Sequence, residues 1–364
     1  MWTEISVYVV LLLGAFSMYL PGSNSALNQK MKFSSNKELK ILSQDISSNE
    51  DFRNMEFKAL VRPMLIPRMP DTENSLFVQN YIKTHFRNLN WHIEEDTFTD
   101  NTPYGMKQFN NIIATYEPDV KNKLVLSCHF DSKNISQGSN YFVAATDSAV
   151  PCAIMMDVAT KLNCALMRNR QTRTKSRAED VSIQMMFFDG EEAYNEWTAT
   201  DSLYGSRHLA KKLAETPDEH FPDIMRLDTV SLFVLLDLIG SNDVVFRNFF
   251  LNTDAQYQFL QKIEKSLKKL DLLNPKGKII NGLEKTLFSS ARPYGGIEDD
   301  HKPFLQYRPD LPVLHLISAP FPAVWHQMSD DESAINWDVT DNFNRIFRIF
   351  VANYLNLSAV SCKN

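Results

Sequence analysis

The sequence predicts one α/β domain with a central, mostly parallel mixed β-sheet flanked by helices. Short apolar runs of strand length alternate with longer stretches of helical spacing, which is the pattern of α/β proteins. The chain has 364 residues, of which 44% are hydrophobic, enough to bury one large core. No internal repeat or second shift in composition divides the chain, so we assign residues 51–364 to a single globular domain.

Residues 1–26 have the features of a secretory signal peptide. The run from 5 to 20 carries no charge, and it is shorter than the ~20 residues that a membrane-spanning helix needs. Small residues follow between Gly22 and Ala26, as a cleavage site requires. Because Glu4 precedes the run and no Lys or Arg does, a retained signal anchor is the alternative.

The elements of the domain follow in order after a polar segment. Residues 27–50 are rich in Ser, Asn and Lys, which predicts a flexible N-terminal segment. Helical spacing then predicts helices at 75–88, 149–167, 202–214, 254–270 and 338–356. Apolar runs predict strands at 91–98, 111–116, 124–130, 181–188, 230–239 and 312–317.

Charge and composition restrict the partners and the compartment. A net charge of −6 and a pI of about 5.8 leave no basic surface for nucleic acid. Four cysteines, together with the sequons at Asn134 and Asn356, fit a secreted, glycosylated protein. The alternative is retention in the secretory pathway by the signal anchor. We expect a monomer that has no stable membrane association once the signal is cleaved.

The pair Glu191-Glu192 carries the strongest chemical signal. It follows the apolar run 181–188 through Asp189-Gly190, so a buried strand delivers two adjacent carboxylates to the edge of the sheet. Adjacent carboxylates repel each other, and a metal held by one of them offsets that repulsion while the other stays free as a base. A solvated acidic loop is the alternative interpretation of this pair taken alone.

Other predicted strand ends carry similar groups. Ligands of open α/β sheets lie beyond the carboxyl ends of the strands, and oxygen and imidazole donors without thiolate suit a catalytic zinc. Each residue also has a structural interpretation: a neighbour of a helix cap, a buried acid bonded to backbone, a surface histidine, or a core histidine in a strand. The residues concerned are His129 and Asp131, Asp147, Asp237, His315 and His326.

Several longer motifs make a family resemblance specific. Residues 50–360 resemble the animal glutaminyl-peptide cyclotransferases, which belong to the wider clan of zinc aminopeptidases, and the motifs occur in the order of that family. The resemblance therefore implies a zinc aminopeptidase-like fold. The motifs are Cys128-His-Phe-Asp-Ser-Lys133, Ala145-Thr-Asp-Ser-Ala-Val-Pro-Cys152, Phe187-Phe-Asp-Gly-Glu-Glu192, Asp201-Ser-Leu-Tyr-Gly-Ser-Arg-His-Leu-Ala210, Asp299-Asp-His301 and Val324-Trp-His326.

The resemblance implies a function and a set of site residues. It implies zinc-dependent cyclisation of an N-terminal glutaminyl residue of peptides and proteins, with ammonia released. An N-terminal glutamyl residue is the secondary substrate that it suggests. It also implies one Zn²⁺ per chain and roles for ten residues. These are Asp147, Glu192 and His326 as ligands, Glu191 as general base and acid, Asp237 and Asp299 as a hydrogen-bonded acid pair beside it, and Trp197, Ile297, Phe321 and Trp325 as pocket walls.

The cysteines divide into two groups. The resemblance implies a disulfide between Cys128 and Cys152. We expect Cys164, on a predicted helix, to be a buried thiol, and Cys362, in the tail, to be free.

Two rival functions remain open on residue types alone. A dizinc aminopeptidase of the same clan could use His129 and Asp237 as additional ligands, although the motifs around Tyr204 and Trp325 favour the cyclase. A non-catalytic binder of peptide N-termini would need a broken site, whereas Glu191 and all three ligands are present.

Overall fold

The computed structural model describes residues 31–43, 50–172, 180–274, 279–280, 283–284, 286–293 and 295–359. The predicted signal segment 1–26 and Cys362 lie outside these residues.

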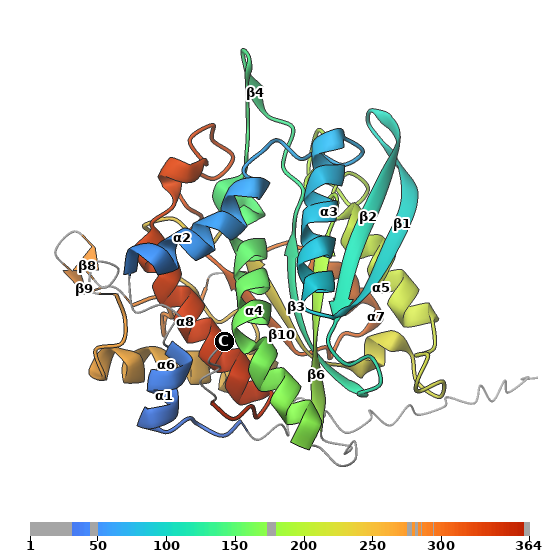
Figure 1. The fold of residues 1–364 in the computed structure, drawn as a ribbon. Helices are drawn as coiled ribbons and strands as arrows, with labels where there is room; N and C mark the ends of the chain where they lie inside the picture. Colours follow the sequence, from blue (N-terminus) through green and yellow to red (C-terminus); the bar gives the residue numbers. More distant parts are fainter. Residues whose placement is uncertain are drawn as a thin grey trace, which may run out of the picture.

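A six-stranded mixed sheet forms the centre of the molecule (Figure 1). The strand order is β1-β2-β6-β3-β7-β10, with β6, β3, β7 and β10 parallel and the β1–β2 hairpin antiparallel at one edge. The predicted mostly parallel sheet is confirmed. The strands are β1 His92–Thr102, β2 Gly105–Thr115, β3 Asn122–His129, β6 Val181–Phe188, β7 Val230–Asp237 and β10 Val313–Ile317.

The central strands are apolar along their length because helices cover both faces of the sheet. Alternate residues of a strand point to opposite faces. In β3, Leu124 and Leu126 join the larger core cluster, whereas Val125 joins the smaller one. In β7, Val234 and Phe233 divide in the same way.

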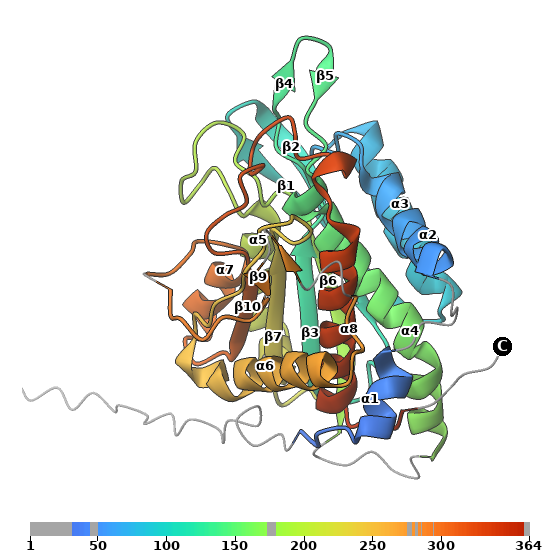
Figure 2. The ribbon, with the colours of Figure 1, turned by 90° about the vertical axis from the view of Figure 1, so that its left-hand side faces the viewer.

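The helices form two layers (Figure 2). The larger cluster takes residues from α1 Asn36–Ser43, α2 Glu50–Val61, α3 Glu73–Asn88, α4 Val150–Thr172, α6 Asp254–Lys269 and α8 Trp337–Tyr354. The smaller cluster takes residues from α5 Tyr204–Glu215 and α7 His301–Tyr307. Short hairpins also occur at β4 Ser136–Gln137 with β5 Asn140–Tyr141, and at β8 Ile279–Ile280 with β9 Leu283–Glu284.

The long apolar helix at the centre is a core helix. The stretch Ala145–Thr172 has the length and composition of a membrane span, but 72% of its most apolar window is buried inside the protein. Burial against the sheet therefore accounts for its hydrophobicity.

The segment 27–50 is not flexible throughout, which corrects the prediction. Helix α1 lies inside it, with Leu39 and Leu42 buried in the core. The Arg348 guanidinium of α8 also donates a hydrogen bond to the carbonyl of Leu42 at 2.9 Å. Two leucines one turn apart give this short polar stretch an apolar face, which tertiary packing stabilises.

Two of the three expectations about cysteines fall on the described residues, and of these one is confirmed and one is wrong. Cys128 and Cys152 form a disulfide with a Cα–Cα distance of 5.8 Å. Cys164 is also disulfide-bonded and only partly buried, not a buried thiol. It lies toward the exposed end of α4.

Candidate active site

A cavity of about 430 Å³ lies at the carboxyl edge of the parallel strands. The loops that follow β6, β7 and β10 and the turn that precedes α4 contribute its walls. All ten site residues implied by the resemblance line this cavity. The lining residues are Lys133, Asp147, Glu191, Glu192, Asn195, Trp197, Asp237, Leu238, Ile297, Glu298, Asp299, Ile317, Phe321, Trp325 and His326.

The three predicted zinc ligands converge from three separate loops. Nε2 of His326 lies 3.1 Å from Oε1 of Glu192 and 3.3 Å from Oδ2 of Asp147. One ligand atom from each of the three residues falls within 4.8 Å of the other two. The fold therefore brings Asp147 and His326 into contact although they are 179 positions apart in the sequence.

The donor atoms of this group suit a zinc ion. Oδ2 of Asp147 is buried and accepts no hydrogen bond from the described residues. Nζ of Lys133 donates to Oε2 of Glu192 at 3.1 Å, which leaves Oε1 to face His326. One imidazole and two carboxylates, with cavity space beside them, match a catalytic zinc site with an open coordination position.

Protonation of His326 also reflects this environment. Burial lowers the pKa of His326, but its contacts with Asp147 and Glu192 outweigh burial and raise that pKa to about 9. A metal ligand must be neutral, so binding of an ion here displaces a proton from the ring.

A second group of donors surrounds His129. Its Nε2 lies 3.1 Å from Oδ1 of Asp147 and 3.5 Å from Oδ1 of Asp237, and its Nδ1 lies 3.4 Å from Asp131. Together, His129, Asp147 and Asp237 meet the spacing of a metal-binding group. However, the Ser148 hydroxyl donates to Oδ1 of Asp237, the oxygen nearest His129.

Glu191 and its neighbour are held by their backbone. The amide groups of Glu191 and Glu192 donate to the two oxygens of Asp131 at 3.1 and 3.2 Å. The preceding Gly190 has a φ of +72°, and a Cβ there would lie 2.4 Å from the ring of Phe109. Only glycine fits this turn, which explains the Gly in the motif.

Glu191 is buried, with 7% of the residue exposed, and its carboxyl group lies among other acids. Burial raises its pKa well above the usual range, and Glu192 and Asp300 raise it further, although His129 opposes them. A carboxyl group whose pKa is raised in this way can both accept and return a proton.

Asp237 and Asp299 both line the cavity, and the hydrogen bond between them that the resemblance implies stays a prediction. Oδ2 of Asp299 lies 2.6 Å from Nε2 of His315, and its Oδ1 accepts from the Asp300 amide. His315 therefore supports an acid of the site. Burial raises the pKa of Asp299, and it raises that of Asp237 to about 6.

Aromatic rings form the outer wall. The ring of Trp325 stacks on His326 at 4.2 Å and meets Phe321 edge-on at 4.8 Å. Trp325 and Trp197 are 39% and 43% exposed, so both present ring surface at the mouth of the cavity. Ile297 completes the apolar lining.

Three supporting residues were not assigned roles from the sequence. Asp131 and Lys133 follow the β3 strand in the motif after His129, so their position at a strand end was an available signal. Asp330 accepts a hydrogen bond at 2.9 Å from the amide of Thr146, next to Asp147. Nothing in the sequence near Asp330 indicates that contact, because it joins segments 184 residues apart.

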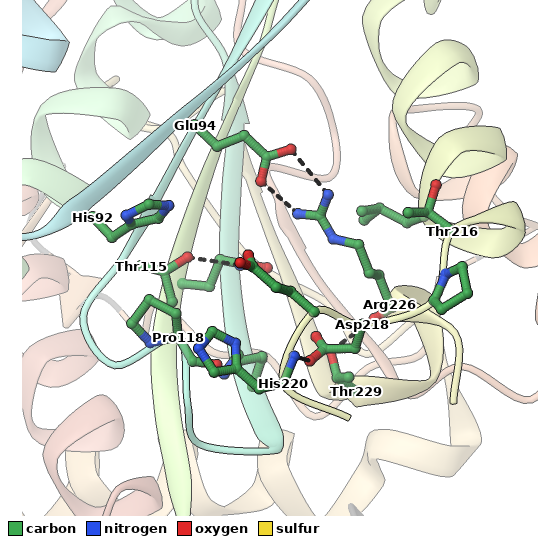
Figure 3. A pocket seen from close by; sticks show the side chains of 14 residues that line it. His92, Glu94, Thr115, Pro118, Thr216, Asp218, His220, Arg226 and Thr229 are labelled. Carbon is green, nitrogen blue, oxygen red and sulfur yellow. Dashed lines mark hydrogen bonds and ion pairs between the residues drawn. The ribbon is translucent and has the colours of Figure 1, made fainter. Parts of the chain in front are cut away.

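A second cavity, of about 310 Å³, lies at the opposite edge of the sheet (Figure 3). The guanidinium of Arg226 donates two hydrogen bonds to Glu94 at 2.9 and 2.6 Å. Lys123 donates to backbone carbonyls, and Gln184 donates to Thr115 at 2.8 Å. These polar groups already have hydrogen-bond partners, and none of the groups of metal-binding donors found among the described residues lies in this cavity.

Comparison with known proteins agrees with the geometry of the site. Residues 111–351 match the model of peptidase family M28. The glutaminyl-peptide cyclotransferase of Bos taurus is 45% identical over 303 residues, which are 82% of this chain and 81% of that protein. The protein of the same name from Boiga irregularis is 44% identical over 304 residues, covering 82% and 80%. The crystal structure of Macrostomum lignano glutaminyl cyclase superposes with a TM-score of 0.80 at 33% identity, covering 92% of this chain and 98% of that one.

Proposed function

The chain belongs to peptidase family M28 and, within it, to the glutaminyl-peptide cyclotransferases, and we propose that Asp147, Glu192 and His326 hold the zinc ion it uses. The enzyme converts an N-terminal glutaminyl residue to pyroglutamyl and releases ammonia. The observation that carries the zinc assignment is the convergence of these three donors beside the buried carboxyl group of Glu191.

The cavity selects the N-terminal residue of a peptide. Trp325, Phe321 and Ile297 bind the aliphatic part of the side chain, and Trp197 covers the mouth. Exclusion of water by these apolar groups protects the amide from hydrolysis. Because the amine and the amide belong to one residue, their proximity is already supplied by the substrate.

Glu191 moves the proton. When bound, zinc supplies a positive charge that polarises the γ-carbonyl group of the substrate. Glu191 accepts a proton from the attacking α-amine and returns it to the departing nitrogen as ammonia forms. The Asp131 carboxylate accepts a hydrogen bond from the Glu191 amide and thereby holds the backbone from which this side chain projects.

Asp237 and Asp299 supply negative charge around the amine. Both line the cavity and are buried, so they favour a cationic α-ammonium group on binding. His315 and the Ser148 hydroxyl orient Asp299 and Asp237 respectively. These contacts support roles in orientation and charge for the two acids.

One zinc ion per chain is supported over two. The Ser148 hydroxyl and the Leu238 amide both donate to Oδ1 of Asp237, and a second ion would compete with them for that oxygen. We expect metal analysis of the purified protein to give one zinc per chain and His326→Ala to give none. Two zinc ions per active wild-type chain would contradict the assignment and favour an aminopeptidase-type centre.

Secretion, glycosylation and a monomeric state belong to the same proposal. The side chains of Asn134 and Asn356 are exposed, as glycan acceptors must be, and the disulfide at Cys128 fits an oxidising compartment. Retention by a signal anchor is the alternative. Recovery of a glycosidase-sensitive protein from the medium of expressing cells, with residues 1–26 removed, is the expected result.

A further inference from the structure

Arg68 is a buried guanidinium outside the cavity. It is fully buried, with 0% of its surface exposed, although arginine is almost never buried unless it is paired. Among the described residues it makes no hydrogen bond to a carboxylate. Its side chain instead donates to five backbone carbonyls, those of Met64, Ile66, Phe130, Val143 and Ala144.

Two of these contacts fix the loop that leads to Asp147. Nitrogens of the guanidinium lie 2.6 Å from the carbonyl oxygen of Val143 and 3.0 Å from that of Ala144. Ala144 has a φ of +48°, in the left-handed region that a residue with a Cβ seldom adopts. Such a conformation persists only where its surroundings determine it, and Arg68 supplies part of that determination.

Another pair of contacts fixes the loop after β3. Nε of Arg68 donates to the carbonyl of Phe130, and the backbone amide of Arg68 donates to the Ser132 hydroxyl at 2.9 Å. Asp131 lies between Phe130 and Ser132 in the sequence and accepts hydrogen bonds from the amides of Glu191 and Glu192. Arg68 thus supports Glu192 indirectly, through Asp131, and supports Asp147 through the loop at Val143 and Ala144.

The charge of Arg68 is matched to the acidic cluster. Burial lowers its pKa to about 10, whereas the nearby carboxylates of Asp131, Asp147, Asp330 and Glu192 act in the opposite direction. The group therefore stays cationic at neutral pH. A fixed positive charge behind the loops lowers the cost of holding these acids together, without competing for their oxygens.

We propose that Arg68 is a positioning residue for the metal centre, because its planar guanidinium holds the loop that presents Asp147 in register with the loop whose Asp131 supports the backbone of Glu192. This inference rests on the proposed zinc site. The guanidinium of Arg68 has five N–H donors in a rigid, planar arrangement, which can bind several carbonyls at once. A lysine cannot reproduce this arrangement. Supporting contacts of metal ligands commonly change metal affinity by about 10–100-fold when they are removed.

The test measures zinc affinity of the apo-protein by competition with a chelator, alongside the thermal midpoint. We expect Arg68→Met to raise the zinc dissociation constant by about 10–100-fold, and Arg68→Lys, which keeps the charge but not the fork, to raise it by a smaller factor. Arg62→Met is the surface control, since Arg62 is 59% exposed and pairs with Glu332. This control is expected to bind zinc as the wild type does.

A second control separates positioning from a general loss of stability. Leu267→Ala removes a buried side chain of α6, away from the cavity, and is expected to lower the thermal midpoint without changing zinc affinity. Equal weakening of zinc binding by Leu267→Ala would overturn the inference. The inference would also be overturned if folded Arg68→Met bound zinc with the wild-type affinity. If Arg68→Met does not fold, wild-type affinity in Arg68→Lys would overturn it instead. Absence of zinc binding in the wild type would instead refute the proposed function.

Discussion

Two adjacent glutamates are put to different uses by their surroundings. Glu192 has Lys133 at one oxygen and His326 at the other, which fixes it as a ligand. Glu191 points into the same cavity but among acids, with its pKa raised by burial. The sequence suggested this division from their place at a strand end. The contact with Lys133 that sets it depends on the fold.

Glu191→Gln separates catalysis from metal binding. The amide keeps the size of the side chain but cannot carry a proton, so we expect activity to fall by ~10²–10⁴-fold with zinc still bound. Glu192→Gln and His326→Ala are expected to lose zinc together with activity. Near-full turnover by zinc-loaded Glu191→Gln would show that another group shuttles the proton.

The pH profile of the reaction is set by the attacking amine as well as by the enzyme. A peptide α-amine has an unperturbed pKa of about 7.7–8.0 and attacks only when neutral. The raised pKa of Glu191 acts in the same direction, because the carboxyl group must be ionised to accept a proton. We therefore expect kcat/KM to rise through roughly pH 7–8, with the midpoint moving when the substrate amine's pKa is changed. If the midpoint does not move when the pKa of the substrate amine is changed, the rise in kcat/KM with pH comes from an enzyme group alone.

At the scale of elements, the carboxyl ends of parallel strands collect the chemistry. The apolar runs predicted all six long strands. They therefore also predicted which strand each acid or histidine at these ends follows. Helices α1, α2 and α7 were not predicted, because each is short or rich in polar residues and is stabilised by packing on the core. The hydrogen bond between Asp299 and His315 could not be predicted either, because it joins the segment before α7 to β10 and depends on how the fold places them.

The disulfide joins the end of β3 to the first turn of α4. Closing a loop with a sequence separation of 24 restricts the unfolded chain and stabilises the fold by about 3 kcal/mol. We expect Cys128→Ala with Cys152→Ala to lower the free energy of unfolding by about that amount, measured in denaturant, while kcat/KM of the folded fraction stays near the wild-type value. A selective loss of turnover at unchanged stability would place the bridge in the catalytic apparatus instead.

At the scale of the whole molecule, two helical layers hold a sheet whose one edge carries the site. The family resemblance and the apolar periodicity sufficed to predict this architecture and ten of the residues that line the cavity. Arg68 and Asp330 could not be predicted, since each acts through backbone groups of loops distant in sequence. Cys164 was misassigned for a related reason: whether a half-exposed cysteine is bonded depends on what the fold brings to it.

The most direct test of the account is the product formed from a Gln-initiated peptide. We expect mass spectrometry to show that the peptide loses one ammonia and keeps its length, that a zinc chelator abolishes the change, and that added zinc restores it. Release of free glutamine with a peptide shortened by one residue would contradict the account and identify an aminopeptidase.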